Sequence, residues 1–345
     1  GTIDRLIAGA LGAVGQGDVG VPMAMFVITL AVSAMGAPLA GLVMTPVAMR
    51  IAQRRGMDQM LMGLVIGTST SAGGFAPTSL FGIVTYGTAR QANIPLSPLV
   101  LFAVALAANL AILLAGFVAF RRPGRSPGGA VEVDFVEARA WSGAQQVTLL
   151  CTAGLFIAVV GATLAGLDTD VGVLSLAFAA VLALVDPKTG SAAVSKIDWS
   201  TVLLVGGLLT FVGVLQKSGA VDLLGHLATT VSTPLVTALL ICVVGGLVSA
   251  FASTTGILAA LVPLALPVIG AGGLSGWALI SSLAVCASLV DLSPYSTTGA
   301  TVVASASEDQ RPRVTRLMTR WGFALVLLGP LLLVGLLVAP SSMGK

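Results

Sequence analysis

The amino-acid sequence predicts an all-α polytopic membrane protein built from two related halves. Three observations support this fold class. Only 9% of the 345 residues are charged, whereas a soluble globular chain carries about 25%. The charges leave long apolar runs, of which residues 223–290 form the longest. Blocks of sequence in the first half also recur in the second half at a nearly constant offset.

The apolar runs have the length and pattern of membrane-spanning helices. No Asp, Glu, Lys or Arg occurs in residues 19–49, 59–89, 91–120, 140–167, 199–216, 223–290 and 321–344. A helix that crosses a bilayer needs about 20 apolar residues. The apolar positions do not alternate with polar ones, which argues against a β-barrel. A chain with so few charges cannot cover a soluble surface, which excludes a soluble enzyme, a disordered chain and a nucleic-acid-binding domain.

The repeat consists of four blocks that keep their order. Phe75–Gly82 aligns with Leu292–Gly299 at an offset of 217 through the pattern Ala/Ser-Pro-x-Ser-x-x-Gly. The other aligned blocks are Ser33–Met35 with Ser249–Phe251, Pro46 with Pro263, and Gly1–Asp4 with Gly219–Asp222. We expect a first repeat over 1–120 that is N-terminally incomplete and lacks about two spans, a linker over 121–140 and a second repeat over 141–345. The alternative is an asymmetric protein in which 141–217 has no counterpart.

Each half is expected to contain a re-entrant hairpin, a broken helix and a full span. In the first half these are a hairpin over 22–49 with its tip near Gly36–Pro38, a broken helix over 59–90 and a span over 97–120. The second half begins with spans over 145–165, 171–186 and 199–217 and an interfacial amphipathic piece over 219–231. A hairpin over 234–270 follows, with its tip at Ser253–Gly256. The chain then forms a span over 276–290, a break at Ser293–Gly299, a half-helix to about residue 307 and a last span over 314–339.

The positive charges predict the orientation of this layout. If the two repeats are inverted and the linker 121–140 is cytoplasmic, 14 of the 17 Lys and Arg residues lie on the cytoplasmic side. Only Arg90, Lys217 and Lys345 then lie outside. Cytoplasmic loops of membrane proteins carry such an excess of positive charge. The split therefore supports a multi-pass protein of the inner (plasma) membrane, with the lipid bilayer as its surroundings and hairpins that enter from opposite faces.

The hairpin tips and the broken helices are the expected binding site. Inverted repeats with interrupted helices are typical of secondary transporters, whose site lies at the repeat interface. The N-terminal end of a half-helix favours an anion, and freed carbonyls with hydroxyls suit a small cation. The candidate substrate- and cation-binding residues are Gly36, Pro38, Gly73, Gly74, Pro77, Thr78, Ser79, Ser253, Thr254, Thr255, Gly256, Asp291, Ser293, Pro294, Ser296, Thr297 and Thr298. The alternatives are hydroxyls that bond to their own helix and a simple proline kink.

Asp291 is the one acid deep in an apolar region. Intramembrane carboxylates are costly and indicate function. Asp291 is expected at the C-terminal end of a half-helix, where a bound cation or a proton would relieve its unfavourable position against the helix dipole. The sequence has a single histidine, His226, and it lacks nucleotide-binding and hydrolase motifs. We therefore expect no catalytic residues, no enzyme activity, no cofactor and no metal beyond a transported Na⁺.

Two segments resemble a known family. Leu61–Gly87 and Asp291–Ala304 are similar to the bacterial malonate/dicarboxylate carrier family of the ion-transporter superfamily, which is related to the divalent anion:sodium symporters. Phe251–Gly256 resembles the hairpin-tip Ser-Asn-Thr motif of that superfamily, with Thr254 in the Asn position, whereas Gly36–Pro38 lacks this motif. The resemblance implies a homodimeric elevator-type transporter that moves a small dicarboxylate, malonate-like or C4, across the inner membrane. It also implies that Ser71 belongs to the first-half share of the binding site.

Charge supports coupling of this transport to Na⁺ or H⁺. No Lys or Arg lies near either break, so a divalent anion would meet only dipoles and hydroxyls, and a bound cation would supply the missing positive charge. The alternatives within transport are a citrate or inorganic oxyanion carrier of the same superfamily and an inactive fragment of such a transporter. An intramembrane enzyme would need a nucleophile with its base, or metal ligands, which the sequence does not offer at membrane depth.

Overall fold

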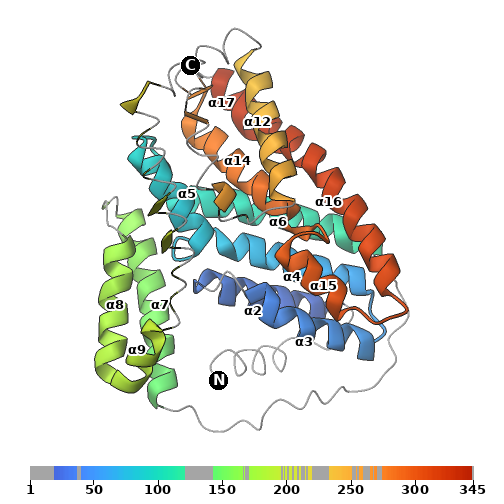
Figure 1. Ribbon diagram of the computed structural model, residues 1–345, viewed down its shortest axis with the longest axis horizontal. Coiled ribbons are helices and arrows are strands. Elements are labelled where there is room, and N and C mark those ends of the chain that lie inside the picture. The colour runs from blue at the N-terminus through green and yellow to red at the C-terminus, as the bar shows by residue number, and fades with distance from the viewer. Residues whose placement is uncertain are drawn as a thin grey trace.

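The computed structural model describes residues 19–36, 40–120, 143–165, 171–195, 233–250 and 274–343, together with scattered residues between 167 and 269. The elements of the first half are α2 (Gly20–Ala34), α3 (Ala40–Arg54), α4 (Gln59–Gly74), α5 (Leu80–Gln91) and α6 (Pro98–Phe120). The second half contains α7 (Gly143–Leu164), α8 (Val171–Val185), α9 (Pro187–Val194), α12 (Pro234–Ser249), α14 (Gly276–Leu289), η1 (Val290–Leu292), α15 (Thr297–Ser305), α16 (Arg311–Leu333), η2 (Val334–Val338) and α17 (Ala339–Met343). Every regular element within these ranges is helical (Figure 1), which confirms the all-α fold class.

Three helical stretches of the described chain are long and apolar enough to cross a membrane. They are Pro98–Phe120, Gly276–Ser305 and Arg311–Ser341. Shorter apolar helices include α2 and α12, which are the first arms of the two predicted hairpins. The protein is therefore a helical membrane protein.

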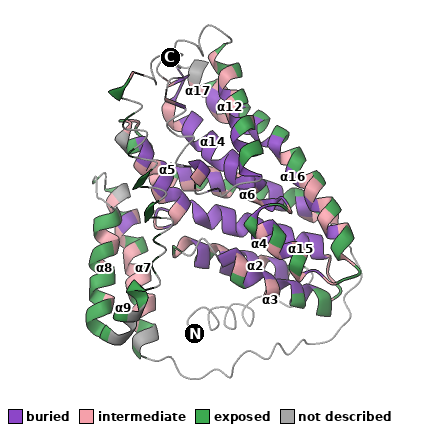
Figure 2. Cartoon of the chain, viewed as in Figure 1, coloured by how far each residue is buried: buried purple, intermediate pink, exposed green. Residues whose placement is uncertain are grey.

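The two broken helices occupy the centre of the fold. Every residue of α4 is buried, and so is the stretch Ala278–Leu289 of α14 (Figure 2). Helices α2, α3 and α6 pack around α4, while α12 and α16 pack around α14. A helix that is apolar and buried on all sides belongs to the core of a bundle rather than to its lipid-facing surface. The polar residues of α4 and α14 thus lie away from lipid.

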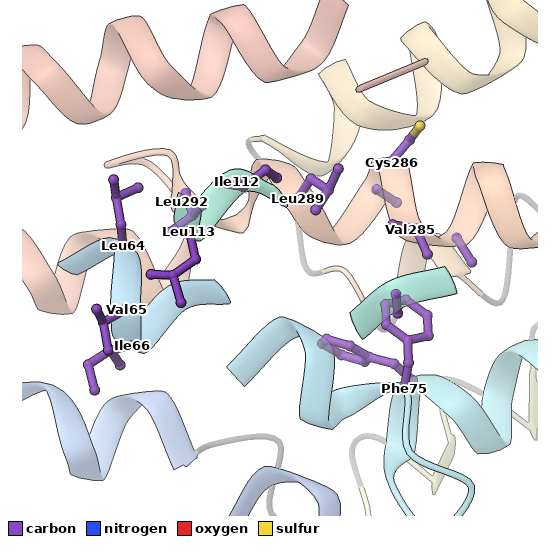
Figure 3. Packing of buried hydrophobic residues seen from close by; sticks show 14 of the residues in the cluster. Leu64, Val65, Ile66, Phe75, Ile112, Leu113, Val285, Cys286, Leu289 and Leu292 are labelled. Atoms are coloured by element: carbon purple, nitrogen blue, oxygen red, sulfur yellow. The ribbon is translucent and has the colours of Figure 1, made fainter. Parts of the chain in front are cut away.

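The apolar core joins the two halves. Figure 3 shows side chains from α4, α6, α14 and η1 in one cluster. The labelled members from these elements include Leu64, Val65, Ile66, Ile112, Leu113, Leu289 and Leu292. Lipid tails are as apolar as these side chains, so close packing rather than removal from water holds α4 and α14 together.

The outer helices expose apolar side chains. Examples are Leu114, Val118, Leu176, Leu184 and Leu336. In water such a surface would aggregate, whereas in a bilayer it faces hydrocarbon. Helices α7 and α8 pack side by side (Figure 1), and α7 also contacts α6.

Helix boundaries in the structure follow the charge-free runs with small differences. The predicted break in 59–90 falls between Gly74 and Leu80, and the half-helix after the second break ends at Ser305, in agreement with the predicted end at about residue 307. The last span is not a uniform α-helix, because α16 contains Pro330 and continues as the π-helical η2. Proline lacks the N–H that an α-helix needs, and π-turns often absorb such interruptions. The predicted span 199–217, the piece 219–231 and the linker 121–140 lie outside the continuously described residues.

The helix starts show the same spacing as the sequence blocks. Helices α4 and α14 begin 217 residues apart, and so do α5 and α15. Each pair flanks a break, because α4 ends before α5 begins and α14 ends in η1 before α15 begins. The inverted orientation of the two halves and the domain limits stay predictions.

Candidate functional site

The second break places a carboxylate against a residue of the predicted second hairpin. Helix α14 ends at Leu289, and the short 3₁₀ segment η1 carries Asp291, which is half-buried. The hydroxyl of Thr254, from the predicted hairpin tip, donates a hydrogen bond to Asp291 Oδ1 over 2.6 Å. Thr254 is buried, and its Oγ1 also lies 3.3 Å from the Oγ of Ser249. Two hydroxyls and a carboxylate thus offer oxygen atoms, the ligands that small hard cations prefer.

Hydroxyls of the second break also fix its backbone. Ser293 donates to the carbonyl oxygen of Ala250, at the end of α12, over 3.3 Å. Ser296 donates to the carbonyl oxygens of Asp291 and Ser293, and its Oγ accepts the N–H of Gly299 over 3.1 Å. Ser296 therefore caps α15 and at the same time binds backbone carbonyls of η1 and of the break.

The start of α15 presents free backbone donors. The N–H groups of Thr297 and Thr298 have no acceptor among the described residues. Thr297 is exposed and Thr298 is half-buried, so a ligand can reach this turn. Unpaired N–H groups at a helix N-terminus carry partial positive charge and favour an anion. The break therefore separates an end of α14 that favours a cation from an end of α15 that favours an anion.

The first break is tied to the first hairpin in a similar way. Thr78 donates to the carbonyl oxygen of Ala34 over 2.6 Å, and Ser79 donates to that of Ser33 over 2.8 Å. Ser33 in turn donates through Oγ to the carbonyl oxygen of Thr70 over 2.9 Å. Gly36, which ends this hairpin arm, has a φ of +91°, and a side chain there would meet the Thr78 carbonyl. In both halves, then, a hydroxyl of the break bonds the end of the first hairpin helix, at Ala34 and at Ala250.

The glycines before the first break allow close packing. A Cβ on Gly73 would lie 2.5 Å from the Leu30 carbonyl oxygen, and one on Gly74 would lie 2.6 Å from the ring of Phe81. The rings of Phe75 and Phe81 are 5.6 Å apart, and Phe75 and Pro77 are buried. The first break is therefore closed by aromatic packing, whereas Pro294 is half-buried at the second break and Tyr295 beside it is exposed.

The two halves meet through a pair of serines. Ser71 on α4 donates to Ser288 on α14 over 2.9 Å, and these residues are 217 positions apart. The amide of Asn109 on α6 donates to Ser71 over 3.2 Å. All three side chains are buried. Residues at equivalent positions of two repeats touch each other where the repeats are related by an internal two-fold axis, and the Ser71–Ser288 contact has this form.

The structure brings most of the predicted residues into two clusters. The first-half cluster contains Gly36, Ser71, Gly73, Gly74, Pro77, Thr78 and Ser79, and the second-half cluster contains Thr254, Asp291, Ser293, Pro294, Ser296, Thr297 and Thr298. Gly256 is described as helical and half-buried, with no contact that bears on a ligand. Pro38, Ser253 and Thr255 lie outside the described residues.

Three residues that the sequence did not single out belong to the same region. Asn109 joins Ser71 at the contact between the halves. Gly41 of α3 lies against Thr70 of α4 and against Thr298 of α15. The run Thr68–Ser71 could have drawn attention to Thr70, but the partners of each hydroxyl depend on tertiary contacts that sequence does not reveal.

A bundle with buried broken helices, bridging hydroxyls and an intramembrane carboxylate is typical of secondary transporters. The family model described as CitMHS: Citrate transporter matches residues 1–245. Because this match covers more than half of the chain, the protein belongs to the citrate transporter family, which is a family of transporters rather than of enzymes. No curated protein matches the chain. The resemblance to the superfamily is thereby supported, while its malonate/dicarboxylate branch stays a prediction.

Proposed function

We propose that this protein is a secondary active transporter that carries a small di- or tricarboxylate across the inner membrane together with Na⁺ or H⁺. The observation that carries the proposal is the second break. It holds Asp291 with Thr254 at the end of α14 and free N–H groups at the start of α15. A site that offers both a cation position and an anion position over one break suits the joint movement of an anion and a cation.

Electrostatics explain why the two would move together. Residues 59–89 and 292–310 contain no Lys or Arg, so helix dipoles and hydroxyls must hold the substrate charge. A helix terminus contributes about half an elementary charge, which is too little to balance two or three carboxylates. A cation bound at Asp291 would neutralise that carboxylate, and it would thereby remove the repulsion between Asp291 and the anionic substrate.

The substrate class follows from size and family. The family description favours citrate, whereas the resemblance of Leu61–Gly87 and Asp291–Ala304 favours a malonate-like or C4 dicarboxylate. Both substrate types present at least two carboxylates on a short carbon chain, and either can place one carboxylate at α15. Citrate and a dicarboxylate would therefore use the same site for one carboxylate, and they differ in the remaining groups of the substrate that the site must hold.

An elevator mechanism in a homodimer is part of the proposal. Helix α7 packs on α8 and contacts α6, and we assign this pair to the scaffold that stays still while the broken helices move. Spin labels on α8 and α15 would show a change in distance on addition of citrate with Na⁺, and an unchanged distance distribution would count against the elevator. Mass photometry in detergent micelles would test the dimer.

Ligand-dependent thermal stability tests the substrate and the ion. The purified full chain would be heated with citrate, malonate, succinate or sulfate, each with Na⁺ or with K⁺ and at two pH values. A ligand at about 100 times its Kd stabilises the folded state by about 2.7 kcal/mol. Stabilisation by a carboxylate that depends on Na⁺ or on low pH supports the proposal. Stabilisation by sulfate alone, or by none of these ligands, contradicts it.

A further inference from the structure

The first three turns of α16 carry four arginines, and the helix contains no Asp or Glu. Two of these arginines are engaged within the protein, because Arg313 pairs with Asp58 over 2.8 Å and Arg311 donates to two backbone carbonyl oxygens at the end of α15. Arg316 and Arg320 are exposed, and neither has an ion-pair or hydrogen-bond partner among the residues that the structure describes. Like charges one helical turn apart repel each other, so an anion bound to both would be stabilised.

The helix face that carries these two arginines continues as an exposed apolar strip, formed by Phe323, Leu327 and Leu331. Their side chains are 46%, 58% and 55% exposed, and Figure 2 shows exposed residues along α16. From Arg316 and Arg320 to the end of the strip, the positions are spaced by three or four residues, so they follow one face of the helix. This single face is therefore cationic at its start and apolar further along.

An aromatic contact marks the membrane level at which this face changes character. The rings of Trp321 on α16 and of Phe120 at the end of α6 are 5.6 Å apart. The charge-free run 91–120 ends at Phe120, and the charge-free run 321–344 begins at Trp321. Aromatic residues are enriched where the membrane meets water. The two arginines without a described partner therefore lie at the level of the lipid headgroups, and the apolar strip lies in the hydrocarbon.

We propose that this face of α16 binds an anionic phospholipid, with the headgroup phosphate on Arg316 and Arg320 and an acyl chain along the apolar strip. Guanidinium groups bind phosphate oxygens through paired hydrogen bonds, and two cations favour a lipid of net negative charge over a zwitterionic one. A free phosphate would contact only the cationic end of the face. The positive charges predict that the lipid belongs to the cytoplasmic leaflet, and the inference does not depend on which substrate the protein carries.

The same turn of α16 also contacts the second break. A Cβ on Gly322 would lie 3.3 Å from the Cα and the Cβ of Ser293. Gly322 is buried and lies on the side of the helix opposite to the arginines and the apolar strip. A lipid bound to the outer face would thus hold α16 in its place against the break, and it is expected to raise the thermal stability of the protein.

Native mass spectrometry of matched variants tests the lipid site. The purified full chain in detergent micelles would be titrated with dioleoyl phosphatidylglycerol to obtain the Kd of the first bound lipid. Arg316→Gln and Arg320→Gln should each raise this Kd about fivefold, and the double variant should raise it about 25-fold. Arg50→Gln is the control, because Arg50 is also exposed without a described partner but lies on α3. Its Kd should stay within about twofold of wild type.

Lipid chemistry and folding are controlled separately. Dioleoyl phosphatidylcholine should bind wild type more weakly than phosphatidylglycerol, and glycerophosphoglycerol, which is the headgroup without acyl chains, should not compete. All variants should share the wild-type Tm in lipid-free detergent, while phosphatidylglycerol should raise the Tm of wild type more than that of the double variant. Equal Kd values for wild type and the double variant would overturn the site. A loss in Arg50→Gln as large as in Arg316→Gln, or competition by the free headgroup, would overturn it as well.

Discussion

Gly299 sits where α15 turns back against the second break, and replacing it by alanine gives a sharp test of that geometry. A Cβ at this position would lie 1.8 Å from the carbonyl oxygen of Ser293 and 2.6 Å from its carbonyl carbon. These are backbone atoms of the break, which cannot swing aside as the end of a flexible side chain can. Gly299→Ala must therefore move either α15 or the Ser293 peptide.

Two opposing effects determine how much folding free energy Gly299→Ala should lose. Alanine in a helix is favoured over glycine by about 1 kcal/mol. Overpacking a close contact costs about 1–3 kcal/mol, and a clash with the backbone belongs at the upper end of that range. We therefore expect Gly299→Ala to lose about 2 kcal/mol of folding free energy, because the clash outweighs the gain in helix propensity.

The assay needs a glycine control in comparable structure. Gly87 lies in α5, the helix that follows the first break, and a Cβ there would have nothing within 4 Å. Thermal unfolding of the purified protein, followed by tryptophan fluorescence, should show a lower Tm for Gly299→Ala and an unchanged or slightly higher Tm for Gly87→Ala. At about 2–4 °C per kcal/mol, the drop should be roughly 4–8 °C. Equal Tm values for the two variants would refute the close approach at the break.

Three further predictions concern other contacts. Asp291→Asn keeps an acceptor for Thr254 and should leave the Tm nearly unchanged. Uptake driven by an ion gradient should fall at least about tenfold, because the cation position is lost. Full gradient-driven uptake by this variant would show that Asp291 has no part in the mechanism. Asp58 caps α4 and also pairs with Arg313 over 2.8 Å. Asp58→Asn can still cap and should lower the free energy of unfolding by about 1 kcal/mol, and Asp58→Ala should lower it by about 1 kcal/mol more. Denaturant titration would measure both values, and equal losses in the two variants would contradict the capping role. In a double-mutant cycle, Ser71→Ala and Ser288→Ala should show a coupling energy of about 1 kcal/mol, and additive effects would mean that the two serines do not interact.

Helix positions could be predicted from sequence because bilayer thickness constrains them directly. Runs without charge gave the cores of α6, α14 and α16, and the Pro-containing blocks at Pro77 and Pro294 located both breaks. A proline followed by hydroxyl residues cannot continue a regular helix, and its neighbours must find new hydrogen-bond partners. Such local constraints leave few alternatives, so a single sequence is sufficient.

Contacts between distant segments could not be predicted in the same way. Thr68 and Thr70 are the same residue type on the same helix, yet one hydroxyl bonds its own helix and the other faces Gly41 of α3. Asn109 lies in a charge-free span with no pattern that pairs it with Ser71. The bond between Thr254 and Asp291 joins a predicted hairpin tip to a predicted break, but only folding decides which hydroxyl of the tip reaches the carboxylate.

Gradient-driven uptake tests the central claim most directly. The full chain would be reconstituted in liposomes and given radiolabelled citrate, malonate or succinate with an inward Na⁺ gradient, an inward H⁺ gradient or neither. The account predicts that at least one carboxylate accumulates above its external concentration with one of the two gradients, and that dissipating that gradient with an ionophore abolishes the accumulation. Uptake that only equilibrates, with the same rate under all three conditions, would contradict secondary active transport by this protein.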